Sequence, residues 1–183
     1  MFLFDSTMIL LIPGIIIGII AQGMVSSRYN YFKKVRNRNG YTGEQVARLM
    51  LNEAGLYNVK IAYSNAELSD NYNPKSEILT LSKEVAFGSS IAAAGIAAHE
   101  VGHAIQHSTS YEPLKVRNSI IPIVEFNASN RALKILSSRN ILYGDELDGA
   151  KKVLSAAALT YVAAALMSIL QLIRLIVINN RND

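Results

Sequence analysis

The chain has 183 residues, enough for one modest domain, and half of them are hydrophobic. The mean hydropathy is positive, which is unusual for a soluble domain of this size and predicts that some apolar residues face lipid. Cysteine is absent, which excludes disulfides and thiolate ligands, so any metal site must use His, Asp or Glu. The net charge of +4 is small. Its basic residues gather beside an apolar segment, which favours a membrane anchor over a nucleic-acid-binding surface.

Two uncharged apolar segments, residues 6–27 and residues 153–173, are long enough to cross a bilayer as helices. The first has neither a basic start nor a clear cleavage site, so a retained anchor is favoured over a signal peptide. Pro13 and Gly14 are expected to kink it. For the second segment, a buried helix of a soluble core is the alternative. The predicted parts are a transmembrane helix at 1–27, a domain at 28–152 and a transmembrane helix at 153–178.

Five basic residues follow the first apolar segment, namely Arg28, Lys33, Lys34, Arg36 and Arg38. Basic residues beside a membrane span stay on the cytoplasmic side. The sequence therefore predicts a multi-pass protein of the cell membrane, with the lipid bilayer as a partner and the middle of the chain in the cytoplasm.

A first helix of the middle segment is predicted from local signals. Thr42 and Gln45 have the spacing of a capping box, and Gly55 suits the left-handed residue that ends a helix. The apolar residues expected on one face are Val46, Leu49 and Met50.

Residues 59–63 and residues 77–82 have the pattern of strands, and residues 69–74, reading SDNYNP, have turn composition. The second strand is a candidate edge on which an extended peptide substrate adds as a further strand.

Two further helices are expected, one from Ser89 or Ser90 to about His107 and one over residues 124–138. The predicted fold class is therefore mostly α with a small β-sheet (α+β).

The motif HEVGH occupies residues 99–103 of the long helix. His99 and His103, four residues apart, project from one helical face and can share one metal ion. Glu100 lies beside them, placed to take a proton from water that a zinc ion activates. A structural His pair is the alternative, but two His and one Glu are costly to bury in an apolar helix without a metal or partner. The motif predicts zinc-dependent hydrolysis of peptide bonds.

A catalytic zinc needs a third protein ligand, and the sequence offers three candidates. His107 is about 12 Å of helical rise from His99, too far to share the ion, so it is expected to pack or to contact substrate. Asp148 lies in LDG, a tripeptide that resembles part of the intramembrane site-2 protease motif. Glu125 lies on the next helix, from which a carboxylate can reach the imidazoles. Weak candidates for stabilising an oxyanion are His107, Tyr111 and Arg131.

Longer stretches carry a resemblance to a known family. HEVGHAIQH, followed by EFNASNRALKIL and GAKKVLSAAALTYVAAAL, resembles the YugP-like membrane-bound neutral zinc metallopeptidases. The resemblance extends upstream through YTGEQVARLML, GLYNVKI and ELSDNYNPKSEILTLS. It implies a membrane-anchored, zincin-like metallopeptidase domain acting on peptides or proteins.

The resemblance also implies roles for individual residues. His99 and His103 would bind Zn2+, with Glu100 as the general base. Glu125 would be the third ligand, as in the related HtpX-like peptidases. Those relatives have Asp where this chain has Ser129, so support of a histidine would come from a hydroxyl or from elsewhere.

The chain departs from the family between the two ligand helices. Members usually carry a long hydrophobic region there, whereas residues 118–124, reading NSIIPIV, are too few to cross a bilayer. The chain is either a naturally short member, or has lost a membrane hairpin, or has residues missing at this point.

Three functions are therefore open. The first is a membrane-bound endopeptidase, the second an intramembrane site-2-type protease using Asp148, and the third a non-catalytic zinc-binding membrane scaffold. Glu100 argues against the scaffold, because a structural zinc site needs no carboxylate there. Polar segments on both sides of the His helix argue against the intramembrane protease.

Overall fold

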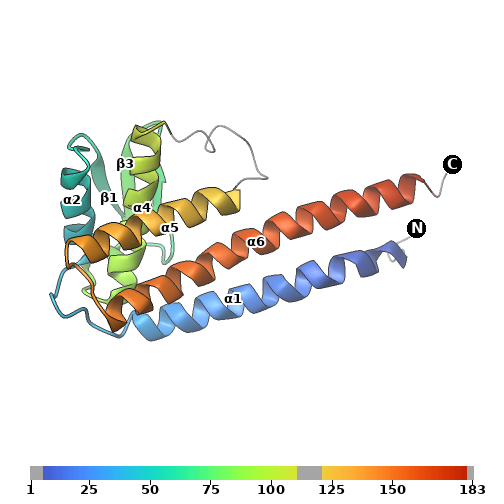
Figure 1. Ribbon diagram of the computed structural model, residues 1–183, viewed down its shortest axis with the longest axis horizontal. Coiled ribbons are helices and arrows are strands. Elements are labelled where there is room, and N and C mark those ends of the chain that lie inside the picture. Colours follow the sequence, from blue (N-terminus) through green and yellow to red (C-terminus); the bar gives the residue numbers. More distant parts are fainter. Residues whose placement is uncertain (1–5, 111–120, 181–183) are drawn as a thin grey trace.

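The computed structural model describes residues 6–110 and 121–180. Two long helices, α1 (Ile12–Phe32) and α6 (Asp145–Asn179), run side by side in opposite directions, and the 3-10 helix η1 (Ser6–Leu11) precedes α1 (Figure 1). The remaining elements gather around one end of this helix pair (Figure 1). Both long helices are apolar and long enough to cross a membrane.

The two apolar segments are parts of longer helices than the sequence predicted. Pro13, where a kink was expected, lies in the first turn of α1, just after the 3-10 helix η1 ends. That position suits proline, because the first N–H groups of a helix have no partner within the helix. The helix continues past residue 27 to Phe32, and α6 already begins at Asp145, before the predicted second span.

Helix α2 (Gly43–Glu53) starts as its capping box predicts. The Thr42 hydroxyl accepts from the Gln45 backbone, and the Gln45 side chain accepts from the Thr42 backbone. Gly55 is in the left-handed region with φ of 73°, as expected after the helix. The prediction that Leu49 belongs to the buried apolar face is wrong, because Leu49 is exposed while Val46 and Met50 are buried.

The sheet has three strands in the order β1-β3-β2. Strand β1 (Lys60–Ser64) is parallel to β3 (Ile78–Ser82), and β2 (Asn71–Asn73) is antiparallel to β3. The predicted turn at residues 69–74 therefore contains a strand. Strand β3 is central, so the prediction that it offers an edge to substrate is wrong.

The first two helices after the sheet begin at capping serines. The Ser82 hydroxyl caps the short helix α3 (Lys83–Phe87), which the sequence did not predict. The Ser90 hydroxyl accepts from the backbone of the third residue of α4 (Ile91–Ser108), at a distance of 3.1 Å. The start of this long helix is thereby confirmed. Helix α5 (Ile121–Ser138) begins three residues earlier than expected.

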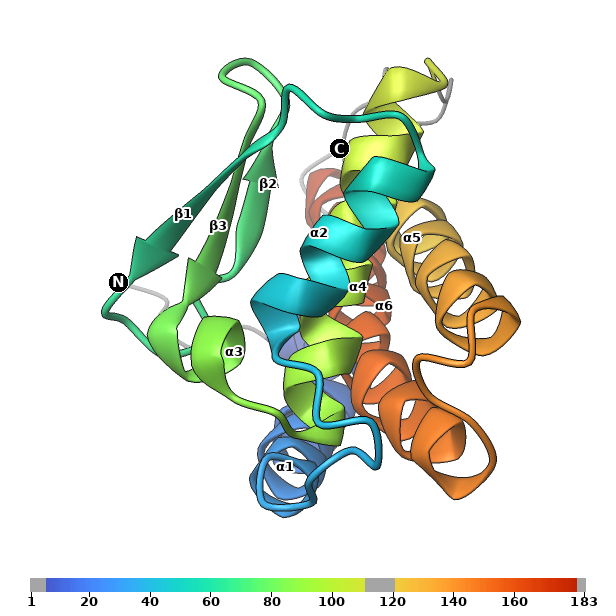
Figure 2. The ribbon, with the colours of Figure 1, turned by 90° about the vertical axis from the view of Figure 1, so that its left-hand side faces the viewer.

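Helix α4 is the centre of the domain. It lies between the sheet and α5, and it also packs against α2 and α6 (Figure 2). Its buried face is rich in Ala and Gly, so neighbouring helices approach closely. Gly102 shows this most clearly: a Cβ added there would lie 2.6 Å from the backbone oxygen of Ala128 on α5. The small residues of α4 thus bring α5 directly against the HEVGH turn. The architecture is mostly helical with a small mixed sheet, as predicted.

Candidate metal centre

Three side chains from α4 and α5 converge on one point. The Nε2 atoms of His99 and His103 lie 3.1 Å apart. The Oε2 atom of Glu125 lies 3.2 Å from Nε2 of His99 and 3.4 Å from Nε2 of His103. Within the described residues, this is the group of His, Asp and Glu side chains whose donor atoms are close enough to share a metal ion.

The spacing of these three donors fits zinc. Zinc binds His nitrogen and carboxylate oxygen at about 2.0–2.1 Å, usually in a tetrahedron. Two ligands of such a tetrahedron are then about 3.3–3.4 Å apart. The three measured separations, 3.1, 3.2 and 3.4 Å, are close to this value. Two imidazoles and one carboxylate also leave the fourth position for water or substrate, as in catalytic zinc sites.

The local sequence explains why the donors meet. His99 and His103 are one helical turn apart on the same face of α4. Gly102, beside His103, lets the backbone of α5 approach at Ala128. Glu125 and Ser129 are one turn apart on α5, and both side chains reach the His pair.

Each histidine is held through its other ring nitrogen. Nδ1 of His99 lies 3.1 Å from the Ser129 hydroxyl. Nδ1 of His103 lies 2.9 Å from Oε1 of Gln106. Such contacts fix the orientation of a metal-binding imidazole. The sequence left open whether such support comes from a hydroxyl or from elsewhere, and the Ser129 hydroxyl lies next to His99.

Gln106 and Asn127 are site residues that the sequence reasoning missed. The buried Gln106 amide donates to the Val124 carbonyl at 2.9 Å and to Oδ1 of Asn127 at 3.0 Å. Nε of Arg131 donates to the same Asn127 oxygen at 2.7 Å. A network of side chains therefore connects His103 on α4 to α5. One signal was available, since Gln106 is three residues after His103 and so lies on its face of the helix.

The charges of the cluster are strongly coupled. Burial alone would raise the pKa of Glu125, but hydrogen bonds to His103 and His99 outweigh it and lower the pKa to about 2. Burial alone would lower the pKa of His103, but the hydrogen bond to Glu125 and the charge of Glu100 outweigh it and raise the pKa. The pocket therefore favours an ionised Glu125 beside a positive charge, which is the arrangement that a cation would complete.

Glu100 lies beside the cluster without belonging to it. Its side chain is buried, and the cluster of metal-type donors in the described residues consists of His99, His103 and Glu125. Burial raises its pKa, and the neighbouring His99 and His103 oppose that effect. A carboxylate with a raised pKa binds a proton more readily than an exposed one.

The other candidates lie elsewhere. His107 is near the end of α4, with Nδ1 3.1 Å from the Tyr72 hydroxyl, and is not part of the cluster, as the helical rise predicted. Asp148 is exposed on the first turn of α6 and also lies outside the cluster. Arg131 contacts Asn127. Tyr111 lies outside the described residues.

Comparison with known proteins agrees with this geometry. A family model described as "Putative neutral zinc metallopeptidase" matches residues 7–125 and residues 123–180. The chain belongs to this family. The zinc of the family description and the His–His–Glu cluster of the structure support zinc as the metal.

A curated relative from Bacillus subtilis (strain 168), "Putative membrane protease YugP", is 36% identical over 208 aligned residues, covering 89% of this chain and 92% of the relative. The two names together support a zinc protease associated with a membrane. No solved structure matches the chain.

The comparisons also locate a difference in length. The aligned length of 208 exceeds the 183 residues of this chain, so the relative has residues within the aligned region that are absent here. The two matches to the family model meet at residues 123–125. This is next to residues 118–124, where the chain lacks the long hydrophobic region that the family resemblance led us to expect.

Proposed function

We propose that this neutral zinc metallopeptidase is a membrane-bound endopeptidase with a zincin-like catalytic domain, in which His99, His103 and Glu125 bind zinc and Glu100 is the general base. The convergence of three zinc-type donors beside a buried carboxylate is the observation that carries the proposal. A purely structural zinc would not need the carboxylate.

The chemistry divides between the metal and the chain. When bound, zinc would act as a Lewis acid that acidifies water and polarises the peptide carbonyl. Glu100 accepts a proton as water attacks the carbonyl carbon, and it gives this proton to the amine that leaves when the C–N bond breaks. Its burial supports both steps, because a carboxyl with a raised pKa holds the transferred proton between them.

The residues around the ligands have supporting roles in this proposal. Ser129 and Gln106 hold the imidazoles so that their Nε2 atoms face Glu125. Arg131 and His107 are the further residues that we propose as candidates for stabilising an oxyanion. Arg131 is on α5, the helix that carries Glu125, and it donates a hydrogen bond to Asn127.

The test separates metal binding from catalysis. Full-length protein in detergent or liposomes is assayed for zinc content and for cleavage of casein, an unstructured protein. Glu100→Gln should keep about one zinc per chain and lose cleavage, because the amide cannot accept the proton. Glu53→Gln, at an exposed carboxylate on α2, is the matched control and should match the wild type.

Each other outcome has a definite meaning. Cleavage by Glu100→Gln at the wild-type rate would remove Glu100 from the mechanism. Zinc binding without any cleavage by the wild type would favour the scaffold function. A wild-type protein that purifies without a transition metal would refute the proposal altogether.

A further inference from the structure

Large aliphatic side chains are exposed on only one half of the α1–α6 helix pair. On α1 they are Ile12, Ile15, Ile16, Ile19 and Ile20, and on α6 they are Ile169, Leu172, Ile173, Leu175 and Ile176. None is exposed on α1 after Ile20 or in the part of α6 before Ile169. Lipid contact is therefore expected for the half that holds the start of α1 and the end of α6.

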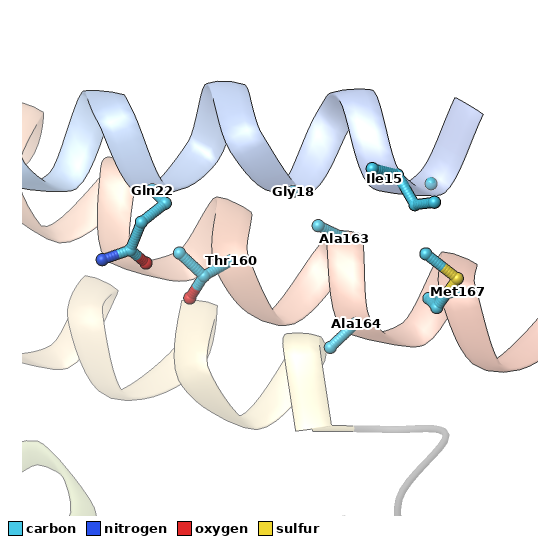
Figure 3. Close-up of a pocket in the computed structure, with 8 residues that line it drawn as sticks. Ile15, Gly18, Gln22, Thr160, Ala163, Ala164 and Met167 are labelled. Carbon is cyan, nitrogen blue, oxygen red and sulfur yellow. The ribbon is translucent and has the colours of Figure 1, made fainter. Parts of the chain in front are cut away.

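Contacts between the helices show where this half ends. The Arg28 guanidinium donates to the Lys152 carbonyl at 2.9 Å, which fixes the register near the domain. Nearer the free ends, Gln22 and Thr160 line one pocket and lie at the same level, facing each other from α1 and α6 (Figure 3). Tyr161 is the next residue on α6 and is exposed. Polar side chains thus replace aliphatic ones at one level on both helices.

The part of α6 before this level belongs to the domain. Its buried residues are Glu146, Gly149, Ala150, Val153, Leu154, Ala156 and Ala158. They pack against α4 and α5 among others, as at Gly95, where an added Cβ would lie 3.3 Å from the Ala150 side chain. The remainder, residues 161–179, is about 28 Å long at about 1.5 Å per residue. That matches a hydrocarbon core of about 30 Å.

The first turn of α5 extends past this level, about one helical turn toward the free end of α6 (Figure 3). Helix α5 packs along α6, and its first turn lies level with Ala164 (Figure 3). Ile121 and Ile123 on this turn, and Phe126 on the next turn, are exposed. These apolar side chains continue the aliphatic surface of the helix pair onto the helix that carries a metal ligand.

Glu125 lies between Ile123 and Phe126 in the sequence, so the metal centre lies at this boundary. Tyr161 on α6 is exposed at this boundary. Tyrosine is typical of the membrane–water interface, where its ring lies in the apolar region and its hydroxyl in the polar one.

We propose that the bilayer surface meets the protein at Gln22 and Tyr161, that the first turn of α5 inserts into it, and that the enzyme consequently cleaves peptide segments directly beside a membrane-inserted segment. The second part rests on the proposed function. The boundary differs from the one predicted at residue 153, since it lies about two helical turns nearer the end of α6. An extended chain advances about 3.3 Å per residue, so a peptide bond only a few residues from the bilayer can reach a centre close to this boundary.

The location is tested first, without any activity. Because the chain has no cysteine, single Cys variants of the full protein can be spin-labelled in phosphatidylcholine liposomes. Oxygen and a water-soluble nickel complex then report the depth of each label. Ile19→Cys should be accessible to oxygen, Ser155→Cys to nickel, and Ile123→Cys should lie between them at the interface. A Ser155→Cys label within the hydrocarbon, or an Ile123→Cys label fully in water, would overturn the boundary.

The substrate class is tested with one cleavable sequence placed about 4, 10, 20 and 40 residues from a transmembrane anchor, in the same liposomes as the enzyme. Cleavage should be fastest at the shorter spacings and at least tenfold slower at the longest. Cleavage that is equal at all spacings would overturn the inference. Absence of cleavage of both this series and casein would instead refute the proposed function, and the depth measurement would still judge the boundary.

Discussion

Nδ1 of His103 faces Oε1 of Gln106 at 2.9 Å, one turn along the same helix. The Gln106 amide nitrogen donates to Val124 and Asn127, so the amide oxygen is the atom that accepts from the imidazole. The proton of neutral His103 is therefore on Nδ1, and Nε2 keeps the lone pair that a metal requires.

Loss of this contact should weaken zinc binding. Gln106→Ala is expected to lower zinc affinity by about 10–100-fold, the usual effect of removing the partner of a metal-binding histidine. Affinity is measured by competition with a chromophoric chelator, and folding by circular dichroism. His107→Ala is the matched control, because it changes the next residue of the helix outside the cluster. An unchanged affinity in folded Gln106→Ala would show that the contact does not orient the ligand.

Glu125 should be the third ligand. Glu125→Ala is expected to lose most of the zinc while staying folded, whereas Asp148→Ala and His107→Ala keep it, because only Glu125 lies within 3.4 Å of the imidazoles. Zinc content and affinity of the three variants decide this. Loss of zinc in Asp148→Ala together with retention in Glu125→Ala would move the protein to the intramembrane protease class.

The close approach of α4 and α5 should depend on Gly102. In Gly102→Ala the new Cβ would lie 2.6 Å from a backbone oxygen, so α5 must shift. We expect a loss of about 1–3 kcal/mol in stability, the usual cost of overpacking, together with weaker zinc binding. Gly23→Ala, at a helical glycine with nothing within 4 Å, should be neutral or slightly stabilising. Equal unfolding curves for both variants would contradict the argument.

The metal-free and zinc-bound proteins should respond differently to pH. Because the pKa of His103 is raised in the folded protein, this histidine stabilises the metal-free fold below pH 6.5, its ordinary pKa. The contribution is lost as pH rises through the pKa of the folded state. The pKa of Glu125 is lowered to about 2, so this carboxylate stabilises the metal-free fold above pH 4.5. This contribution is lost as pH falls toward 2. Together they favour the metal-free fold between about pH 4.5 and 6.5.

Zinc competes with the proton on His103, so its affinity should fall as pH falls, beginning above pH 6.5. Denaturation with and without a chelator, from pH 5 to 8, measures both effects. Zinc affinity that stays constant over this range would contradict the prediction.

The orientation predicted from charge remains to be tested. A reporter inserted at Gly40, in the segment rich in basic residues after α1, should be cytoplasmic. Accessibility of a Cys at this position to a membrane-impermeant reagent, in intact cells and in inverted vesicles, distinguishes the two orientations. Labelling in intact cells would place the domain outside.

Elements defined by local signals were the predictable part of the fold. The capping residues Thr42 and Ser90 and the turn glycine Gly55 each act within a few residues, so their sequence was sufficient. Strand β2 was not predictable in this way. Its Asn-rich sequence is typical of a turn, and it is a strand because it pairs with β3. Tertiary contact overrides local preference there.

The metal site also has a part that was predictable from local sequence and a part that was not. The spacing of His99 and His103 on one helix was enough to predict that they share a metal ion. The spacing of Gln106 after His103 was a local signal for their contact, whereas the role of Asn127 depends on how α5 packs against α4, which no local pattern describes. The boundary proposed at Tyr161 differs from the one predicted at residue 153, because an uncharged segment can be buried by protein as well as by lipid, as the start of α6 is.

Because Gly102 on α4 lies directly against Ala128 on α5, the geometry of the metal centre does not depend on the segment that joins the two helices. The ligand helices hold each other through their own backbones, so the donors do not depend on the length of the connection between them. The two matches to the family model meet beside this connection, and the relative has additional residues within its aligned region. A segment inserted or removed at the connection is therefore expected to leave the three metal-binding side chains in place.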